Sequence, residues 1–120
     1  VAAWYEAELN DVEEISLQKV PPNARKSWFV FVVKLTQKFN QSRRDQILDS
    51  LRKKGIACSD YFSPIHLQPF MRKSFGFKEN DFPVTESVSA RTIALPFYGS
   101  LTHEQVRYTT NTLKKLLLSA

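Results

Sequence analysis

The 120-residue sequence contains one cysteine, three glycines and no long apolar run. A single thiol, Cys58, excludes a disulfide within the chain and is typical of a protein in a reducing compartment. No apolar stretch approaches the roughly 18 to 20 residues that span a bilayer, and the first residues show no signal-peptide pattern. We therefore expect a soluble, cytoplasmic domain without a membrane partner.

Several common kinds of functional site are absent from the sequence. There is no glycine-rich phosphate loop, the two histidines and Cys58 lack zinc-ligand spacing, and no Ser, His and acid arrangement is visible in the chain order. No lysine lies in a recognisable catalytic motif. From these residues alone we predict no catalytic, cofactor-binding or metal-binding residue, and the hypothesis of an enzyme has little support.

What is present is ordinary globular composition: 42% hydrophobic, 24% charged, with nine Phe, four Tyr and two Trp. Such a chain predicts one domain over residues 1–120, with aromatic side chains filling its core. The formal net charge is +5, but the cations cluster on helix faces opposite the apolar stripes, where solvated lysine and arginine are expected. Binding of nucleic acid is therefore kept only as a weak alternative.

The first half of the chain predicts two helices and two strands. Residues 1–9 have helical spacing without a preceding capping residue, so we expect the tail of a linking helix and a chain that is a piece of something longer. Residues 28–35 are aromatic and β-branched and predict a central strand covered on both faces. A helix capped by Ser42 is expected to end at Gly55, followed by a short strand at 56–58.

The second half predicts a short helix or turn at residues 72–77 and a turn leading into a helix within residues 80–90. A short strand at 92–95 follows, closed by a proline. Thr102 and Gln105 form a capping-box pair at the start of the last helix. The predicted class is α+β, with three or four short strands and helices on one or both sides.

The stretch from Gly55 to Phe70 carries two prolines, several aromatics and His66, and it is expected to be irregular. Pro64 and Pro69 are predicted to forbid a helix through it. Because functional groups are often carried by such segments on a rigid scaffold, His66 is a better candidate for a ligand contact than His103 on the last helix. A purely structural role for His66 stays open.

A series of short motifs follows in a fixed order along nearly the whole chain. They are Val-Ala-Ala-Trp-Tyr at 1–5, Trp-Phe-Val-Phe-Val-Val at 28–33, Gly-Ile-Ala-Cys at 55–58, Tyr-Phe at 61–62, Pro-Ile-His-Leu-Gln-Pro-Phe at 64–70, Phe-Gly at 75–76, Asp-Phe-Pro-Val-Thr-Glu at 81–86, Arg91, Leu-Pro-Phe at 95–97 and Leu-Thr at 101–102. In order and spacing these motifs resemble the C-terminal domain of the DegT/StrS-type sugar aminotransferases.

The resemblance implies the small C-terminal domain of a fold-type-I aminotransferase, with a short, mostly antiparallel sheet and packed helices. Its members use pyridoxal phosphate, are typically homodimers, and transfer an amino group, usually from glutamate, to a keto sugar nucleotide. Their large N-terminal domain holds the Schiff-base lysine and most cofactor contacts, and the matched region contains none of these. We therefore expect this chain to bind no cofactor and to be inactive alone, with the N-terminal domain as its missing partner.

By the same resemblance, His66 matches the histidine of the family's Pro-Ile-His motif, which lies near the active-site mouth. The resemblance implies that His66 contacts the sugar-nucleotide substrate, with Tyr61 and Phe62 as its neighbours. Some positions depart from the family pattern. Asn80 replaces a frequent glycine, and Asn tolerates the left-handed backbone conformation better than most residues do. The Ser59-Asp60 pair lacks the arginine that some members have at this place.

The alternative hypothesis is a stand-alone binding module for sugar nucleotide or nucleic acid. The two hypotheses differ in what the surface shows. A domain that has lost its neighbour is expected to expose part of the 28–35 region or the central stretch, and to self-associate.

Overall fold

The computed structural model describes residues 1–119, which form an α+β domain. Its elements are α1 (Ala2–Leu9), β1 (Ile15–Ser16), β2 (Phe31–Leu35), α2 (Gln41–Lys53), the 3-10 helix η1 (Ile65–Leu67), α3 (Pro69–Phe75), α4 (Pro83–Ser89), β3 (Thr92–Leu95) and α5 (His103–Leu118). The predicted class and the short antiparallel sheet are confirmed. None of the helices among these described residues is long and apolar enough to cross a membrane.

The sheet has three antiparallel strands in the order β1-β2-β3. The central strand β2 is almost entirely buried, as its apolar sequence predicts. The prediction that this strand begins at Trp28 was wrong by three residues, because β2 begins at Phe31, opposite Leu95. The next residue after Leu95 in the partner strand β3 is Pro96, which has no N–H to continue the ladder.

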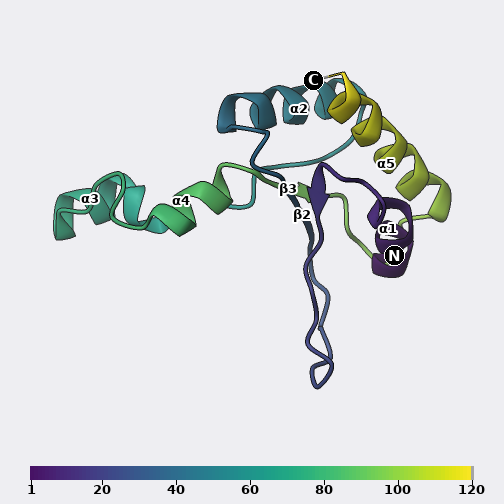
Figure 1. Cartoon of the computed structure of the whole chain (residues 1–120), viewed down its shortest axis with the longest axis horizontal. Helices are drawn as coiled ribbons and strands as arrows, with labels where there is room; N and C mark the ends of the chain where they lie inside the picture. The colour runs from purple at the N-terminus through teal and green to yellow at the C-terminus, as the bar shows by residue number, and fades with distance from the viewer. Residues whose placement is uncertain (120) are drawn as a thin grey trace.

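The helices α1, α2 and α5 pack with the sheet into one body, which Figure 1 shows with α2 and α5 side by side above the strands. Apolar side chains from all these elements meet in one core, to which the aromatic residues contribute the largest side chains. Its fully or almost fully buried members include Tyr5, Leu9, Phe31, Val33, Leu35, Ile47, Leu51, Ile93, Val106 and Leu113.

Two helix ends show how far local rules decide the structure. At α5, Thr102 and Gln105 form both hydrogen bonds of the capping box, as predicted. At α2 the predicted cap, Ser42, was wrong: the N-cap is Asn40, whose side-chain oxygen accepts from the Arg43 N–H at 2.9 Å. Asn and Ser are nearly equal caps, so the sequence alone does not separate the two positions.

The end of α2 follows the prediction, but the next segment does not. Gly55 has a φ of +76°, and the Ile56 N–H returns to the Leu51 carbonyl at 3.1 Å. The strand predicted at residues 56–58 is absent. Only Ser59 forms an isolated bridge, to Ala94, because the preceding residues are still closing the helix end.

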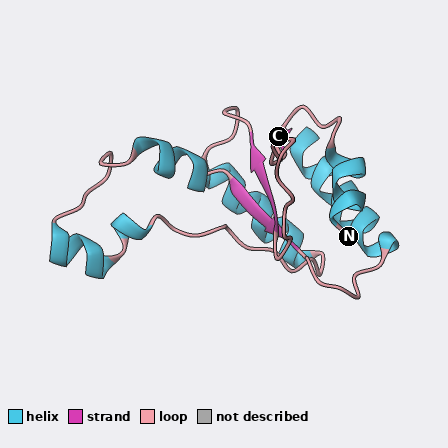
Figure 2. Ribbon diagram, turned by 90° about the horizontal axis from the view of Figure 1, so that it is seen from below, coloured by secondary structure: helices cyan, strands magenta, loops and turns pink. Residues whose placement is uncertain are grey.

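Two segments project from the body. The first is the β1–β2 connection at residues 17–30, which Figure 1 shows as a long hairpin-like loop. It carries Phe29, which is 79% exposed. The second, here called the arm, comprises residues 61–90 with η1, α3 and α4, and extends to one side in Figures 1 and 2. The radius of gyration is 15.5 Å, whereas a 120-residue domain typically has about 14 Å.

The arm is more regular than predicted. Pro64 and Pro69 do not exclude helix: Pro69 occupies the first turn of α3, where no N–H is required, and η1 fits between it and Pro64. The helix expected at 72–77 therefore lies earlier, and it ends at Gly76 with a φ of +70°. The helix expected within 80–90 is α4, as predicted.

Candidate functional site

The three residues predicted to contact substrate all lie at the start of the arm, but in different environments. Phe62 is 70% exposed, and its ring packs on that of half-buried Tyr61 with 4.7 Å between centroids. Phe62 also has a φ of +62°, which is rare for a bulky residue. His66, in contrast, is buried, with 7% of its surface exposed. The structure thus exposes the Phe62 ring and part of the Tyr61 ring to solvent, whereas the His66 imidazole is buried.

The His66 side chain is held by a carboxylate twenty residues away. Its Nε2 lies 2.9 Å from Oε1 of Glu86, on α4. Since an ionised carboxylate only accepts hydrogen bonds, Nε2 carries the proton of this bond. The same carboxylate accepts from the backbone N–H of Asn80 at 3.0 Å and of Phe82 at 3.3 Å. Glu86 therefore ties η1, the 78–82 turn and α4 together.

Aromatic rings surround this hydrogen-bonded group. Phe82 packs edge-on against His66 with centroids 4.8 Å apart, and Phe77 does so at 6.4 Å. Phe77 in turn contacts Phe82 at 5.7 Å and Phe75 at 6.0 Å. His66 is the only buried residue of the arm, so its imidazole, packed against the rings of Phe77 and Phe82, forms the arm's small interior.

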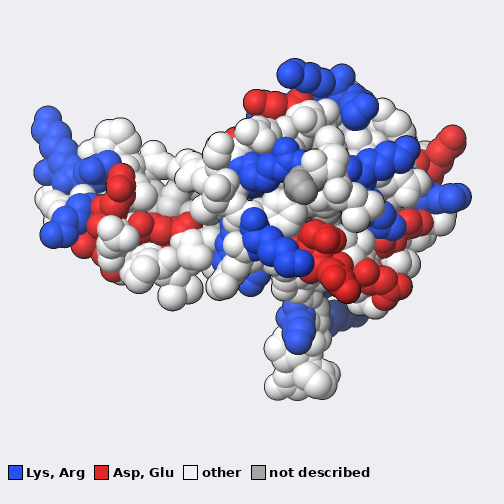
Figure 3. Space-filling view, turned by 45° about the horizontal axis from the view of Figure 1, so that its top comes forward, with Lys and Arg blue, Asp and Glu red and all other residues white. Residues whose placement is uncertain are grey.

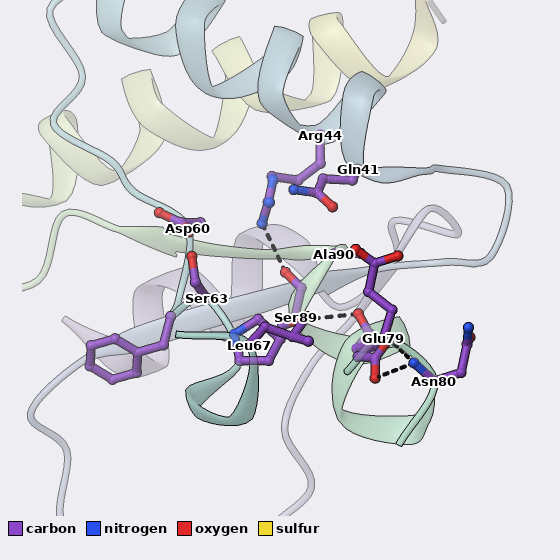
Figure 4. Close-up of a pocket in the computed structure, with 12 residues that line it drawn as sticks. Gln41, Arg44, Asp60, Ser63, Leu67, Glu79, Asn80, Ser89 and Ala90 are labelled. Atoms are coloured by element: carbon purple, nitrogen blue, oxygen red, sulfur yellow. Dashed lines mark hydrogen bonds between the residues drawn. The ribbon is translucent and has the colours of Figure 1, made fainter. Parts of the chain in front are cut away.

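A pocket of about 490 Å³ opens where the arm joins the body. Figure 4 shows Gln41 and Arg44 entering it from α2, with Asp60 and Ser63 on one side and Glu79 and Asn80 on the other. Phe62 also belongs to its lining. The pocket therefore adjoins the exposed Phe62 ring, and its polar groups come from both the arm and the body.

Arg44 is the only cation in the pocket lining, and it is 3% exposed. Its Nη1 donates to the carbonyls of Ser89 and Thr92, each at 2.9 Å, and its Nε donates to Asp45 at 2.7 Å. These bonds fix the end of α4 to the body, as Figure 4 shows for Ser89. Arg91 adds a second tie, donating to the Leu35 carbonyl at 2.8 Å. The root of the arm is therefore held by two guanidinium groups.

The electrostatic balance of the pocket is acidic, because Asp60, Glu79 and Glu86 outnumber Arg44. The backbone N–H of Asn80, and next the His66 side chain, lower the pKa of the Glu86 carboxyl below its ordinary value. Glu86 therefore stays ionised at neutral pH and continues to accept its hydrogen bonds.

We expect this lowered pKa to be visible in an acid titration. A carboxyl whose pKa is lower in the folded protein contributes stability above its ordinary pKa of 4.5, and this contribution disappears as pH falls through the lowered value. The amide resonances of Asn80 and Phe82 are expected to shift with a midpoint below pH 4.5 in ¹H–¹⁵N spectra. The shift is expected to vanish in Glu86→Gln and to persist in Glu79→Gln. A midpoint at or above 4.5 contradicts the assignment.

The other chemistry-bearing residues lie apart from this site. The Cys58 thiol is half-buried, its Sγ lies 3.6 Å from the Leu48 carbonyl, and burial raises the pKa of the thiol. It is therefore a poor nucleophile. His103 lies on the surface against Trp4, with centroids 5.2 Å apart. No group of three or more metal-binding side chains occurs within residues 1–119.

Lysines and arginines do not gather into one basic surface on the visible face. Figure 3 shows them in separate groups, interspersed with Asp, Glu and uncharged residues. This distribution is typical of solvated helix faces and gives no support to the nucleic-acid alternative.

Sequence reasoning missed two residues of this site, Glu86 and Arg44. In the sequence Glu86 is only the last residue of the Asp-Phe-Pro-Val-Thr-Glu motif, and its separation from His66 along the chain hides their contact. Arg44 stood among the cations assigned to a solvated face, yet it is buried. One signal was available for Arg44: it lies three residues before Ile47 and four before Leu48, on the apolar side of α2.

Known proteins resemble this chain over nearly its whole length. The sequence pattern of the DegT/DnrJ/EryC1/StrS aminotransferase family matches residues 1–114. An uncharacterized protein of Methanocaldococcus jannaschii is 31% identical over 117 residues, covering 98% of this chain and 30% of that protein. The spore coat polysaccharide biosynthesis protein SpsC of Bacillus subtilis is 28% identical over 107 residues, covering 88% of this chain and 28% of SpsC.

A solved structure agrees in fold. The putative sugar aminotransferase Spr1654 of Streptococcus pneumoniae, in its PMP form, matches 98% of this chain and 29% of its own, with a TM-score of 0.88 and 21% identity. This chain thus spans about 30% of the length of the curated relatives it matches. On the match to residues 1–114, the chain belongs to the DegT/DnrJ/EryC1/StrS aminotransferase family.

Proposed function

We propose that this chain is one domain of a pyridoxal phosphate-dependent sugar aminotransferase. In this proposal the complete, cytoplasmic and homodimeric polypeptide transfers an amino group from glutamate to a keto sugar nucleotide. The family match over residues 1–114 carries the proposal. It is supported by the name of Spr1654 as a putative sugar aminotransferase, and by the polysaccharide role in the name of SpsC.

The residues of the pocket do not fit the cofactor. Pyridoxal phosphate, when bound, supplies an electron sink and needs a lysine for its Schiff base. The pocket lining has Arg44 but no lysine, and its net charge is unfavourable for a phosphate. We infer that the cofactor is held by another part of the complete polypeptide, and that this domain alone does not catalyse transamination.

What this domain offers is a substrate-facing surface. In the proposal, Phe62 and Tyr61 cover a sugar or base face with their rings, next to the pocket at the arm root. The positive φ of Phe62 supports this role, because strained backbone is concentrated at functional sites. For His66, substrate contact stays a prediction, since its Nε2 is already bonded to Glu86.

The proposal is tested on the complete polypeptide. Glutamate and a panel of keto sugar nucleotides are supplied, and formation of 2-oxoglutarate is measured together with the absorbance of bound pyridoxal phosphate. We expect turnover with at least one sugar nucleotide, and none from the 120-residue chain alone. A complete protein that neither binds the cofactor nor consumes glutamate contradicts the proposed function.

The same assay examines the substrate-facing residues. If His66 contacts the substrate through its other ring nitrogen, Nδ1, His66→Ala is expected to raise KM about tenfold or more. His103→Ala is the matched control, because it changes the second histidine of the chain, which lies on the surface of α5. We expect an unchanged KM in this control. Unchanged KM in both variants removes His66 from the substrate site and leaves it as a support of the arm.

A further inference from the structure

The pocket at the arm root contains two carboxylates that no cation neutralises. Asp60 and Glu79 line it from opposite sides, as Figure 4 shows, and Asp60 is half-buried. Within residues 1–119, neither carboxylate makes a salt bridge or a side-chain hydrogen bond. Glu86, in contrast, is bonded to three other residues. Like charges around one cavity repel each other, so a ligand with a positive charge is favoured there.

A second group in the pocket requires a hydrogen-bond acceptor. The Arg44 side chain is 4% exposed. Its Nε is bonded to Asp45, and its Nη1 to two backbone carbonyls. Its Nη2, however, has no hydrogen-bond partner in the part of the chain that the structure describes. Because buried donors are normally paired, this nitrogen indicates a ligand oxygen, such as a hydroxyl group, in the pocket.

The remaining lining fits a ring that carries hydroxyl groups. The Gln41 amide and the Ser63 hydroxyl have no side-chain partner within residues 1–119, and each can donate and accept hydrogen bonds. Phe62 adds an exposed aromatic ring at the same pocket. The volume of about 490 Å³ is typical of small-molecule sites. A positive charge, several hydroxyl groups and an apolar ring face are combined in an amino sugar.

We propose that this pocket binds the sugar part of the aminated product, and that Asp60 and Glu79 are specificity-determining residues for its ammonium group. This rests on the proposed function, in which a keto sugar nucleotide receives the amino group. The keto group is uncharged, so the two carboxylates favour the product over the substrate. The anionic nucleotide part lies outside the acidic pocket. The complete protein is therefore expected to be inhibited by its own product.

The same pocket does not fit the amino donor. Glutamate also has an ammonium group, but its two carboxylates give it a net negative charge at neutral pH. The pocket has three carboxylates and one guanidinium, which is already paired with Asp45. Repulsion therefore disfavours glutamate, whereas a protonated amino sugar carries no negative group.

The test measures the binding of free sugars to the complete polypeptide by saturation-transfer NMR titration. The probes are glucosamine and glucose at about pH 6.5, below the ordinary pKa of an amine. We expect glucosamine to bind about tenfold more tightly than glucose. In the double variant Asp60→Asn and Glu79→Gln, this preference is expected to fall to about twofold or less.

The matched control is the double variant Asp11→Asn and Glu13→Gln. It removes the same two kinds of charge from exposed residues that lie outside the pocket lining. The preference for glucosamine is expected to persist in this control. An equal fall in both double variants means that the net charge of the protein, and not the pocket, selects the amine, and this overturns the proposal.

Three further outcomes also overturn it: no binding of either sugar, equal binding of the two sugars to the unmodified protein, and displacement of glucosamine by an equal concentration of glutamate. Failure of the proposed function is separate, because sugar binding is measured without turnover. A protein that prefers glucosamine but consumes no glutamate contradicts the proposed function and leaves the amine selectivity of the pocket in place.

Discussion

We expect Phe31→Ala to lower the free energy of unfolding of the chain by about 3–5 kcal/mol, which for a domain of this size is a large part of its total stability. Phe31 is 2% exposed and lies at the first rung of the β2–β3 pair. Its ring stacks on Tyr5 at 4.7 Å and on Trp28 at 5.3 Å, and lies 6.4 Å from Phe97. Truncation removes the ring that all three contact and leaves a cavity between α1 and the sheet.

Urea unfolding followed by tryptophan fluorescence measures this loss, since Trp28 is a direct neighbour. Phe29→Ala provides the matched control, with the same change two residues earlier on a side chain that is 79% exposed. The control is expected to change stability by less than about 0.5 kcal/mol. Similar losses in the two variants contradict the assignment of Phe31 to the core.

The second large effect is expected at Arg44. Arg44→Met keeps much of the side-chain volume but removes the donor shared by the Ser89 and Thr92 carbonyls. A buried acceptor left without a partner costs about 1–3 kcal/mol, so we expect a loss of about 2–5 kcal/mol. Because these bonds lie where α4 returns to β3, hydrogen exchange of the α4 amides is expected to accelerate as well.

Arg107→Met is the control for the loss of an arginine. Its guanidinium is 62% exposed and lies 3.8 Å from Glu8, an ion pair of the kind that contributes about 0–1 kcal/mol. Exchange rates in α4 are expected to be unchanged in this control. If Arg44→Met is as stable as Arg107→Met, the bonds at the arm root do not hold the arm.

The body of this fold could be predicted from sequence because its signals are local. The capping box at Thr102 and the left-handed Gly55 are each decided within a few residues, and both predictions are confirmed. The start of β2 and the missing strand at 56–58 depend instead on which residues lie opposite in the sheet. The pairing of two distant segments cannot be predicted from the sequence of either segment alone.

The candidate site was predicted less well for the same reason. The sequence points to His66 through its proline-rich surroundings, and the structure shows that its environment is set by Glu86 and Phe82 in another helical segment. The positive φ at Asn80 agrees with the expectation from the sequence. The burial of Arg44 could not be predicted from the sequence, because it depends on where the arm rejoins the body at Ser89 and Thr92.

The single buried side chain of the arm has a consequence for how the protein is degraded. A unit with so small an interior opens without disturbing the main core, and local opening exposes peptide bonds to proteases. Limited proteolysis is therefore expected to remove residues between η1 and α4 first. The products, held together by the sheet and the packing of α1 against α5, would remain associated as a nicked domain.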